Sequence, residues 1–105
     1  MTKMAKRIIL YNLAKHVTNE EFENYATNEK GPLIESLPAV KKYELVKITG
    51  AAAGEPPYKY VGIVHVTSVD EFNQKAAKTQ KYKDFLKKFG PMVTDLQILA
   101  GEEIY

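Results

Sequence analysis

Four segments of this chain carry the apolar pattern of a β-strand. They are rich in Ile, Leu, Val and Tyr, and they span residues 7–13, 40–48, 58–66 and 94–99. Between the first and second segments, and between the third and fourth, apolar residues recur at helical spacing. The pattern therefore predicts the element order βαββαβ.

A helix start follows the first strand and the third strand at equivalent positions. Thr18 stands three positions before Glu21, and Ser68 stands three positions before Glu71, fifty residues further on. In a capping box of this spacing, each side chain satisfies a free amide group of the first helical turn. The two halves predict an α+β, ferredoxin-like fold, with a four-stranded antiparallel sheet and the helices on one face.

Helix-breaking residues subdivide this pattern. We expect Gly31-Pro32 to interrupt the first helix, Thr79-Gln80 to break the second, and Gly90-Pro91 to stop it. Residues 50–57 are small and flexible, and they form a connection between the middle strands that is long enough for a flap. Residues 101–105 are predicted to be a tail.

Aromatic residues fall on the predicted inward face of both helices. The positions with helical spacing are Phe22, Tyr25, Ala26 and Leu33 in the first, and Tyr82, Phe85, Leu86 and Phe89 in the second. Tyr25, Phe85 and Phe89 are candidates to line a cavity for a flat ligand, because such sites are mostly apolar. The alternative is that they are core residues, as aromatic stripes at this spacing more often are.

The first and third strands are apolar at nearly every position, as in 8–10 and 61–66. A sheet with one solvated face shows alternation instead, so both faces of this sheet are predicted to be buried. Helices cover one face, and a symmetric partner is the simplest cover for the other. We therefore expect a homodimer that pairs through the open sheet face, forming a dimeric α/β barrel.

Composition excludes several classes of function. The 105 residues, 45% of them apolar, allow one domain over residues 1–105. A net charge of +2, from 15 basic and 13 acidic residues spread along the chain, argues against nucleic acid or membrane partners. No cysteine is present and no segment reads as a signal or membrane span, so the expected location is cytoplasmic. His16 and His65 lack metal-ligand spacing, so no metal or cofactor is expected.

Two residues are candidate catalytic groups. His65 lies in an otherwise apolar strand and can exchange protons near neutrality; the alternative is an interior or dimer-interface histidine. If the fifty-residue offset extends into the strands, Tyr11 points the same way as His65 and orients a substrate. Tyr11 can equally fill the core. Asn12 is either an amide of the pocket or a strand terminator, and we favour the terminator.

Further spacings resemble a known family. The matching residues are Phe22, Tyr25 and Lys30-Gly31-Pro32-Leu33, then Leu37-Pro38 and Tyr43, then Pro56-Pro57-Tyr58 and Tyr60. They are similar, over most of the chain, to the dimeric α/β-barrel proteins related to EthD, and the closing residues 101–105 resemble its RedY-like branch. This resemblance implies a ligand held between sheet and helices, and a part in making the tripyrrole pigment prodigiosin. The expected ligand is a bipyrrole or other aromatic intermediate.

Lys30 departs from the family pattern, since EthD-like sequences usually have a histidine at this position. A mechanism that depends on the imidazole is therefore not carried over. A lysine at this position can bind an anionic group or, if desolvated, act as a base. The simpler interpretation, which we favour, is a solvated lysine that complements the helix dipole.

Three hypotheses follow. The first is a cofactor-independent tailoring enzyme, a cyclase, isomerase or monooxygenase-like protein, with His65 as acid or base, Tyr11 as the orienting group and Lys30 as an anion anchor. The second is a non-catalytic helper that binds a pathway intermediate or assists a partner enzyme. The third is a generic stress-type barrel protein.

Overall fold

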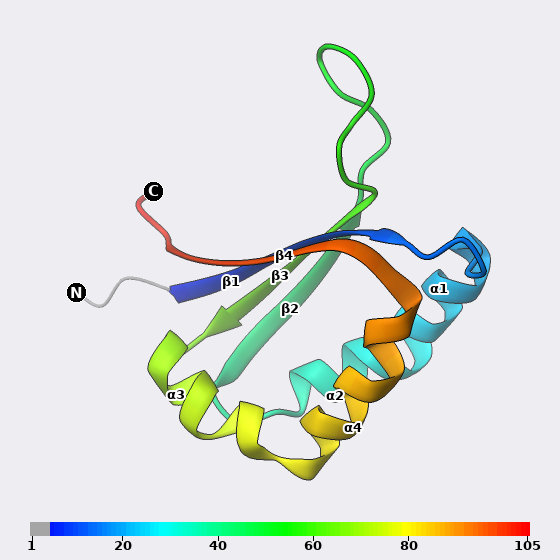
Figure 1. Cartoon of the computed structure of the whole chain (residues 1–105). Helices are drawn as coiled ribbons and strands as arrows, with labels where there is room; N and C mark the ends of the chain where they lie inside the picture. Colours follow the sequence, from blue (N-terminus) through cyan, green and yellow to red (C-terminus); the bar gives the residue numbers. More distant parts are fainter. Residues whose placement is uncertain (1–4) are drawn as a thin grey trace.

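The computed structural model describes residues 5–105 (Figure 1). The sequence predicts that the start of the chain is not a signal segment. Residues 1–4 of this start lie outside the described residues. The elements are β1 (Ala5–Leu13), α1 (Asn19–Tyr25), the π-helix η1 (Ala26–Lys30), α2 (Gly31–Glu35), β2 (Val40–Lys47), β3 (Tyr60–Val66), α3 (Val69–Gln74), the 3₁₀ turn η2 (Ala76–Lys78), α4 (Gln80–Phe89), the 3₁₀ turn η3 (Gly90–Met92) and β4 (Val93–Glu102).

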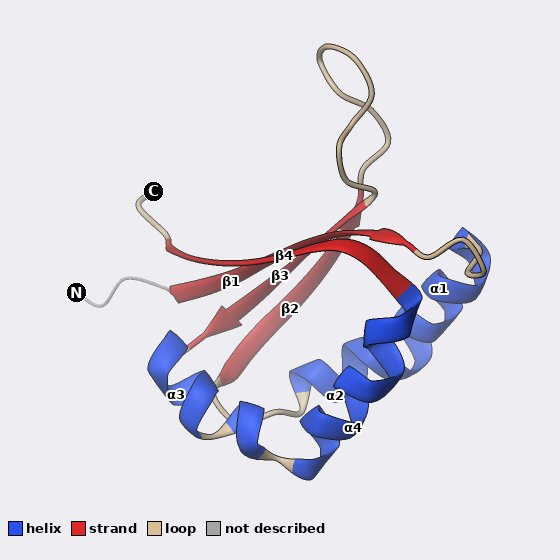
Figure 2. Cartoon of the chain, in the orientation of Figure 1, coloured by secondary structure: helices blue, strands red, loops and turns tan. Residues whose placement is uncertain are grey.

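The four strands form one antiparallel sheet in the order β2-β3-β1-β4. Figure 2 shows all helices on one face of this sheet, with the other face uncovered. The predicted α+β, ferredoxin-like architecture is confirmed. Within residues 5–105, no helix is long and apolar enough to cross a membrane.

Side-chain caps begin three of the helices. The hydroxyl of Thr18 accepts a hydrogen bond from the amide of Glu21 at 3.1 Å, and the hydroxyl of Ser68 accepts one from the amide of Glu71 at 3.0 Å. In both predicted capping boxes, the hydrogen bond that the cap hydroxyl accepts is therefore confirmed. Thr79 has extended backbone angles and caps α4, which explains the predicted break between α3 and α4.

The Gly31-Pro32 pair does not interrupt the first helix, so this prediction is wrong. The chain stays helical from α1 through η1 into α2, and the amide of Gly31 bonds to the carbonyl oxygen of Ala26 in a π-turn. A Cβ atom at Gly31 would lie 3.0 Å from that oxygen, so glycine permits this close approach. The helix widens at this point and then continues.

The π-turn keeps one row of side chains against the sheet. Phe22, Ala26, Lys30 and Ile34 are all buried, at a constant spacing of four residues. In a regular α-helix each step of four rotates a side chain by roughly 40°, so Ile34 would turn away from Phe22 by about 120°. The wider turns of η1 offset this rotation. They also turn Lys30 inward.

Strand β4 is longer than the predicted range 94–99. It reaches Glu102, which pairs with Ala5, so only the end of the predicted tail 101–105 lies beyond the sheet. Residues 50–57 belong to no helix or strand and project beyond the sheet as the β2–β3 connection (Figure 1). The role of this connection as a flap stays a prediction.

Candidate functional site

A small cavity opens between α4 and β4, on the helix-covered face of the sheet. Its volume is about 70 Å³. Leu86, Leu96 and Ile98 border it and are exposed, so they mark its mouth. Its walls are mainly aliphatic and aromatic, and two basic residues, Arg7 and Lys30, also line it.

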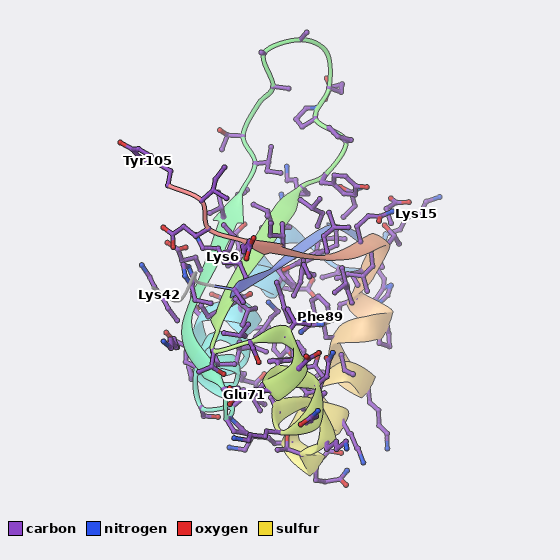
Figure 3. All side chains as sticks on the ribbon, turned by 90° about the vertical axis from the view of Figure 1, so that its left-hand side faces the viewer. Lys6, Lys15, Lys42, Glu71, Phe89 and Tyr105 are labelled. Atoms are coloured by element: carbon purple, nitrogen blue, oxygen red, sulfur yellow. The ribbon has the colours of Figure 1, made fainter. Side chains whose placement is uncertain are left out.

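The aromatic walls come from α3, α4 and, with Tyr43, from β2. The rings of Phe85 and Phe89 stack with centroids 5.2 Å apart, and Tyr82 meets Phe72 edge to face at 5.4 Å. Figure 3 shows Phe89 between the sheet and the helices. The structure thus places the candidates Phe85 and Phe89 at the cavity. Phe72 and Tyr82 line it too, although the sequence interpretation assigned neither to the site.

Tyr25, the third aromatic candidate, lies outside this cavity. It borders a shallow groove on the outer surface between the two long helical segments. The amine nitrogen of Lys88 lies 4.8 Å from the Tyr25 ring centroid, and the nearby carboxylate of Glu29 adds to the effect of burial in raising the Tyr25 pKa to about 12. Tyr25 faces this groove because it precedes the buried position 26 on the helix.

Lys30 is buried, with 4% of its surface exposed, so the favoured interpretation of a solvated lysine is wrong. Its amine contacts the hydroxyl group of Tyr43. The nitrogen also lies 4.5 Å from the ring centroid of Tyr43, 5.2 Å from that of Phe89 and 5.9 Å from that of Tyr11. Burial lowers the pKa of Lys30 to about 7, since the charged form loses its hydration.

The cavity holds basic groups but no acidic partner among the described residues that line it. Arg7, the second basic group, donates to the Tyr82 hydroxyl at 3.3 Å, and its guanidinium carbon lies 4.2 Å from the Phe72 ring centroid. Aromatic faces and hydroxyl groups therefore contact these two basic groups, where carboxylates usually do. A lysine in such surroundings is available to an incoming ligand.

Tyr43 reaches Lys30 from β2, and its ring lies beside Gly62 of the neighbouring strand β3. A Cβ atom at Gly62 would lie 3.5 Å from the Tyr43 ring and hydroxyl group, and a larger side chain would occupy their space. Burial raises the pKa of Tyr43, so its hydroxyl stays protonated. The sequence interpretation used Tyr43 only as a family motif. Its place on the inward face of β2, with Leu45, was the signal that could have identified it.

Tyr11 and His65 do not form a pair, because they lie on opposite faces of the sheet. In the β1–β3 register, Tyr11 faces Tyr60 and His65 faces Lys6. Residues directly opposite in an antiparallel pair share a face, so odd positions of β1 accompany even positions of β3. The predicted alternation failed because residues 14–17 separate β1 from its cap, whereas Thr67 alone separates β3 from its cap. This difference of three residues reverses the faces.

Tyr11 is a core residue that stands next to the cavity. It is fully buried, its ring meets Phe89 edge to face at 5.1 Å, and it stacks on Tyr60 at 5.9 Å. Its hydroxyl group has no hydrogen-bond partner in the described part of the chain. Burial raises its pKa, so the hydroxyl remains protonated and can act as a donor.

His65 lies on the open face. Its Nε2 atom is 2.9 Å from a carboxylate oxygen of Glu44 on β2, and this contact lowers the pKa of the Glu44 carboxyl. The cavity is on the other side of the sheet, so His65 cannot exchange protons with a ligand bound there. Its role as an acid or base in this cavity is excluded.

Asn12 ties three segments together and does not line the cavity. Its side-chain amide donates to the carbonyl oxygen of Pro57 at 3.0 Å and to the carboxylate of Asp95 at 3.1 Å. The β1–β4 register shifts just before Asn12, and Asp95 has a positive φ of 56°. Asn12 thus holds the base of the long connection against a β-bulge in β4, opposite the end of β1. Nowhere in residues 5–105 do three His, Cys, Asp or Glu side chains gather in a way that could hold a metal.

The chain matches a known family over nearly all of its length. The model of the REDY-like protein HapK family matches residues 5–104. No curated protein matches the chain.

Comparison with solved structures gives the fold. HapK from Hahella chejuensis is 22% identical, with a TM-score of 0.79, over 96% of this chain and 93% of that one. An EthD family protein from Bacillus halodurans is 24% identical, with a TM-score of 0.75, over 96% and 99%. A protein from Thermobifida fusca, described as dimeric, ferredoxin-like and of unknown function, is 20% identical, with a TM-score of 0.75, over 98% and 93%.

Proposed function

Since the chain belongs to the REDY-like protein HapK family, we propose that it acts in the biosynthesis of a prodigiosin-type pigment. In this proposal it binds a pyrrole-type aromatic intermediate in the cavity between sheet and helices. The pathway comes from the family, and the place of binding comes from the cavity. We propose further that it works in the cytoplasm.

The observation that carries the proposal is the Lys30 amine, which is buried among aromatic faces in this cavity. Ligand sites are typically apolar, with a few polar groups that fix orientation, and the Lys30–Tyr43 pair supplies such groups here. A cavity of about 70 Å³ is smaller than the roughly 150 Å³ that holds benzene in an engineered protein. A bipyrrole therefore requires the cavity to widen. We propose that the exposed side chains at its mouth, Leu86 and Leu96, move aside for this purpose.

The proposed chemistry needs no cofactor. Near neutral pH the Lys30 amine is partly neutral and accepts a proton, while the Tyr43 hydroxyl is protonated and donates one. The two groups therefore take the acid–base role that the sequence interpretation gave to His65 and Tyr11. This pair favours the enzyme over the non-catalytic helper, because a helper needs no proton-transfer group.

We propose that the protein is a homodimer that pairs through the open sheet face. The apolar residues of this face form an open-face patch, defined as Ile8, Leu10, Val46, Val61, Ile63 and Leu99. Val46 is 48% exposed and Leu99 is 47% exposed, a degree of apolar exposure that favours a partner. The relative from Thermobifida fusca is described as dimeric, which supports a dimer, and the exposed patch is the reason for placing the interface on this face. His65 and Glu44 then belong to the dimer interface.

Complementation of a pigment-producing bacterium tests this function. The host lacks its own HapK-family gene and receives this chain, and pigment and bipyrrole precursors are quantified by mass spectrometry. We expect wild type to restore pigment and Lys30→Met to leave a precursor accumulated. Lys88→Met, which removes an exposed lysine near Tyr25, is the matched control and should restore pigment.

Each outcome has a separate meaning. Failure of the wild-type chain to restore pigment would refute the pathway assignment. Full restoration by Lys30→Met would refute the acid–base role and leave the helper as the better description.

A further inference from the structure

We propose that the Lys30 amine captures a carbonyl group of the ligand as an imine, so that the substrate class is an aromatic aldehyde or ketone. This inference rests on the proposed function, because it requires an aromatic ligand in the same cavity. It goes further by naming the functional group that the protein recognises and the bond that forms.

The residues around Lys30 favour a reactive amine. They do not hold this amine in an ion pair. Four titratable or charged side chains face it or its cavity: Arg7 and Tyr11 from β1, Tyr43 from β2, and Tyr82 from α4. None of these is a carboxylate. With no carboxylate to hold the proton, burial alone acts on the amine, and its pKa falls to about 7.

The fraction of neutral amine follows from this value. At pH 7 about half of the Lys30 amine is neutral, compared with about one in three thousand for a solvated lysine. Only the neutral form is a nucleophile. Lys30 therefore differs in its surroundings from Lys42, Lys75 and Lys88. The side chains of these three lysines are more than half exposed.

The flanking groups suit the two steps of imine formation. The Lys30 nitrogen attacks the carbonyl carbon, a C–N bond forms, and the carbonyl π-electrons move to oxygen. The Tyr43 hydroxyl, already in contact with the nitrogen, relays a proton from nitrogen to oxygen and gives a carbinolamine. Loss of the second nitrogen proton together with the hydroxyl group releases one water molecule and leaves the imine. No oxidant, reductant or cofactor takes part.

The competing use of the cavity is an anion site. Arg7 and Lys30 both line it, and a carboxylate ligand would favour the charged form of both. An anion would bind without a covalent bond, so a chemical trap separates the two uses. A small hydride reagent, cyanoborohydride, serves as the trap, because Lys30 is buried and the exposed Leu86 marks the mouth of its cavity.

The test uses pyrrole-2-carboxaldehyde as the probe and 2-ethylpyrrole as a carbonyl-free analogue of similar size. The full-length protein is incubated with the aldehyde and sodium cyanoborohydride at pH 7, digested, and mapped by mass spectrometry. Binding of both compounds is followed separately by amide shifts in NMR spectra. The variants are Lys30→Arg, which keeps the charge but forms no imine, and Lys88→Met as the surface control.

We expect a reduced adduct on Lys30 at least tenfold above that on any other lysine. Lys30→Arg should lose this adduct, and Lys88→Met should keep it. The labelling rate should level off a little above pH 7, whereas that of exposed lysines rises up to about pH 10. Equal labelling of all lysines, or binding of both compounds without an adduct on Lys30, would overturn the inference and leave the proposed function intact. If neither compound shifts residues of the cavity, both the inference and the proposed binding function fail.

Discussion

Lys30 and Tyr43 bring their polar ends together in the interior, between the π-turn that follows α1 and the inward face of β2. A separate glycine lies beside the backbone or ring that positions each side chain. Gly31 permits the π-turn that directs Lys30 inward, and Gly62 leaves space for the Tyr43 ring. The pair is therefore set by backbone features on two elements, and these features can be changed one at a time.

The first prediction concerns stability against pH. The pKa of Lys30 is about 7 in the folded protein and 10.5 when it is unperturbed, so the unfolded chain binds more protons between these values. The free energy of unfolding contributed by Lys30 therefore rises with pH from about 7 to 10.5, by up to about 1.4 kcal/mol per pH unit. Below pH 7 both states are protonated and the contribution is constant.

Denaturant unfolding of wild type and Lys30→Met at pH 7, 8 and 9 measures this effect. The apolar variant should be the more stable protein at pH 7, and its advantage should shrink at each higher pH. A difference between the two proteins that does not vary over this interval would show that the amine has an ordinary pKa.

The second prediction separates binding from chemistry at Tyr43. Tyr43→Phe keeps the ring and removes the hydroxyl group that contacts Lys30. We expect affinity for pyrrole-2-carboxaldehyde to change by less than about threefold. The rate of imine formation should fall by about 10² or more, in the range that general acid–base groups supply. Stopped-flow absorbance of the imine gives the rate. An unchanged rate would remove Tyr43 from the mechanism.

The third prediction tests whether the π-turn requires glycine at position 31. Alanine usually stabilises a helix relative to glycine by up to about 1 kcal/mol, but a Cβ atom at Gly31 would lie 3.0 Å from the carbonyl oxygen of Ala26. We expect Gly31→Ala to lower the free energy of unfolding by about 1–2 kcal/mol. Gly90→Ala is the matched control, because nothing lies within 4 Å of its Cβ position. Equal effects of the two changes would show that the π-turn tolerates a side chain.

The overall fold could be predicted from the sequence because the local signals for each helix and strand agree with that fold. The hydroxyl caps at Thr18 and Ser68 and the apolar strands each specify their own element, and βαββαβ has few compact arrangements. The site was harder to predict. The face that a strand residue takes depends on the length of the connection after the strand, so His65 was placed on the wrong side. The burial of Lys30 depends on a π-turn, and the helical periodicity of the sequence does not predict this turn.

The fourth prediction concerns assembly. Ile63 lies at the centre of the open-face patch, on β3 opposite Ile8. A glutamate there would place a negative charge in the proposed interface directly opposite Glu44, so we expect Ile63→Glu to be monomeric at micromolar concentration. Light scattering coupled to size-exclusion chromatography measures the mass. Gln74→Glu, on an exposed position of α3, should leave the mass at that of two chains. A monomeric wild type would refute the dimer directly.

The last prediction compares the two faces of the sheet. His65→Gln removes the group that the sequence interpretation placed at the centre of catalysis, but His65 contacts Glu44 on the face away from the cavity. We expect this variant to keep wild-type affinity for the pyrrole aldehyde and a wild-type rate of imine formation. The change should appear in the dimer dissociation constant, because Glu44 loses its contact with the imidazole at the proposed interface and keeps only its ion pair with Lys42. Sedimentation equilibrium gives that constant, and the trapping assay gives the rate. If His65→Gln stopped imine formation while the dimer stayed intact, the two faces would be coupled, and the assignment of chemistry to Lys30 and Tyr43 alone would be wrong.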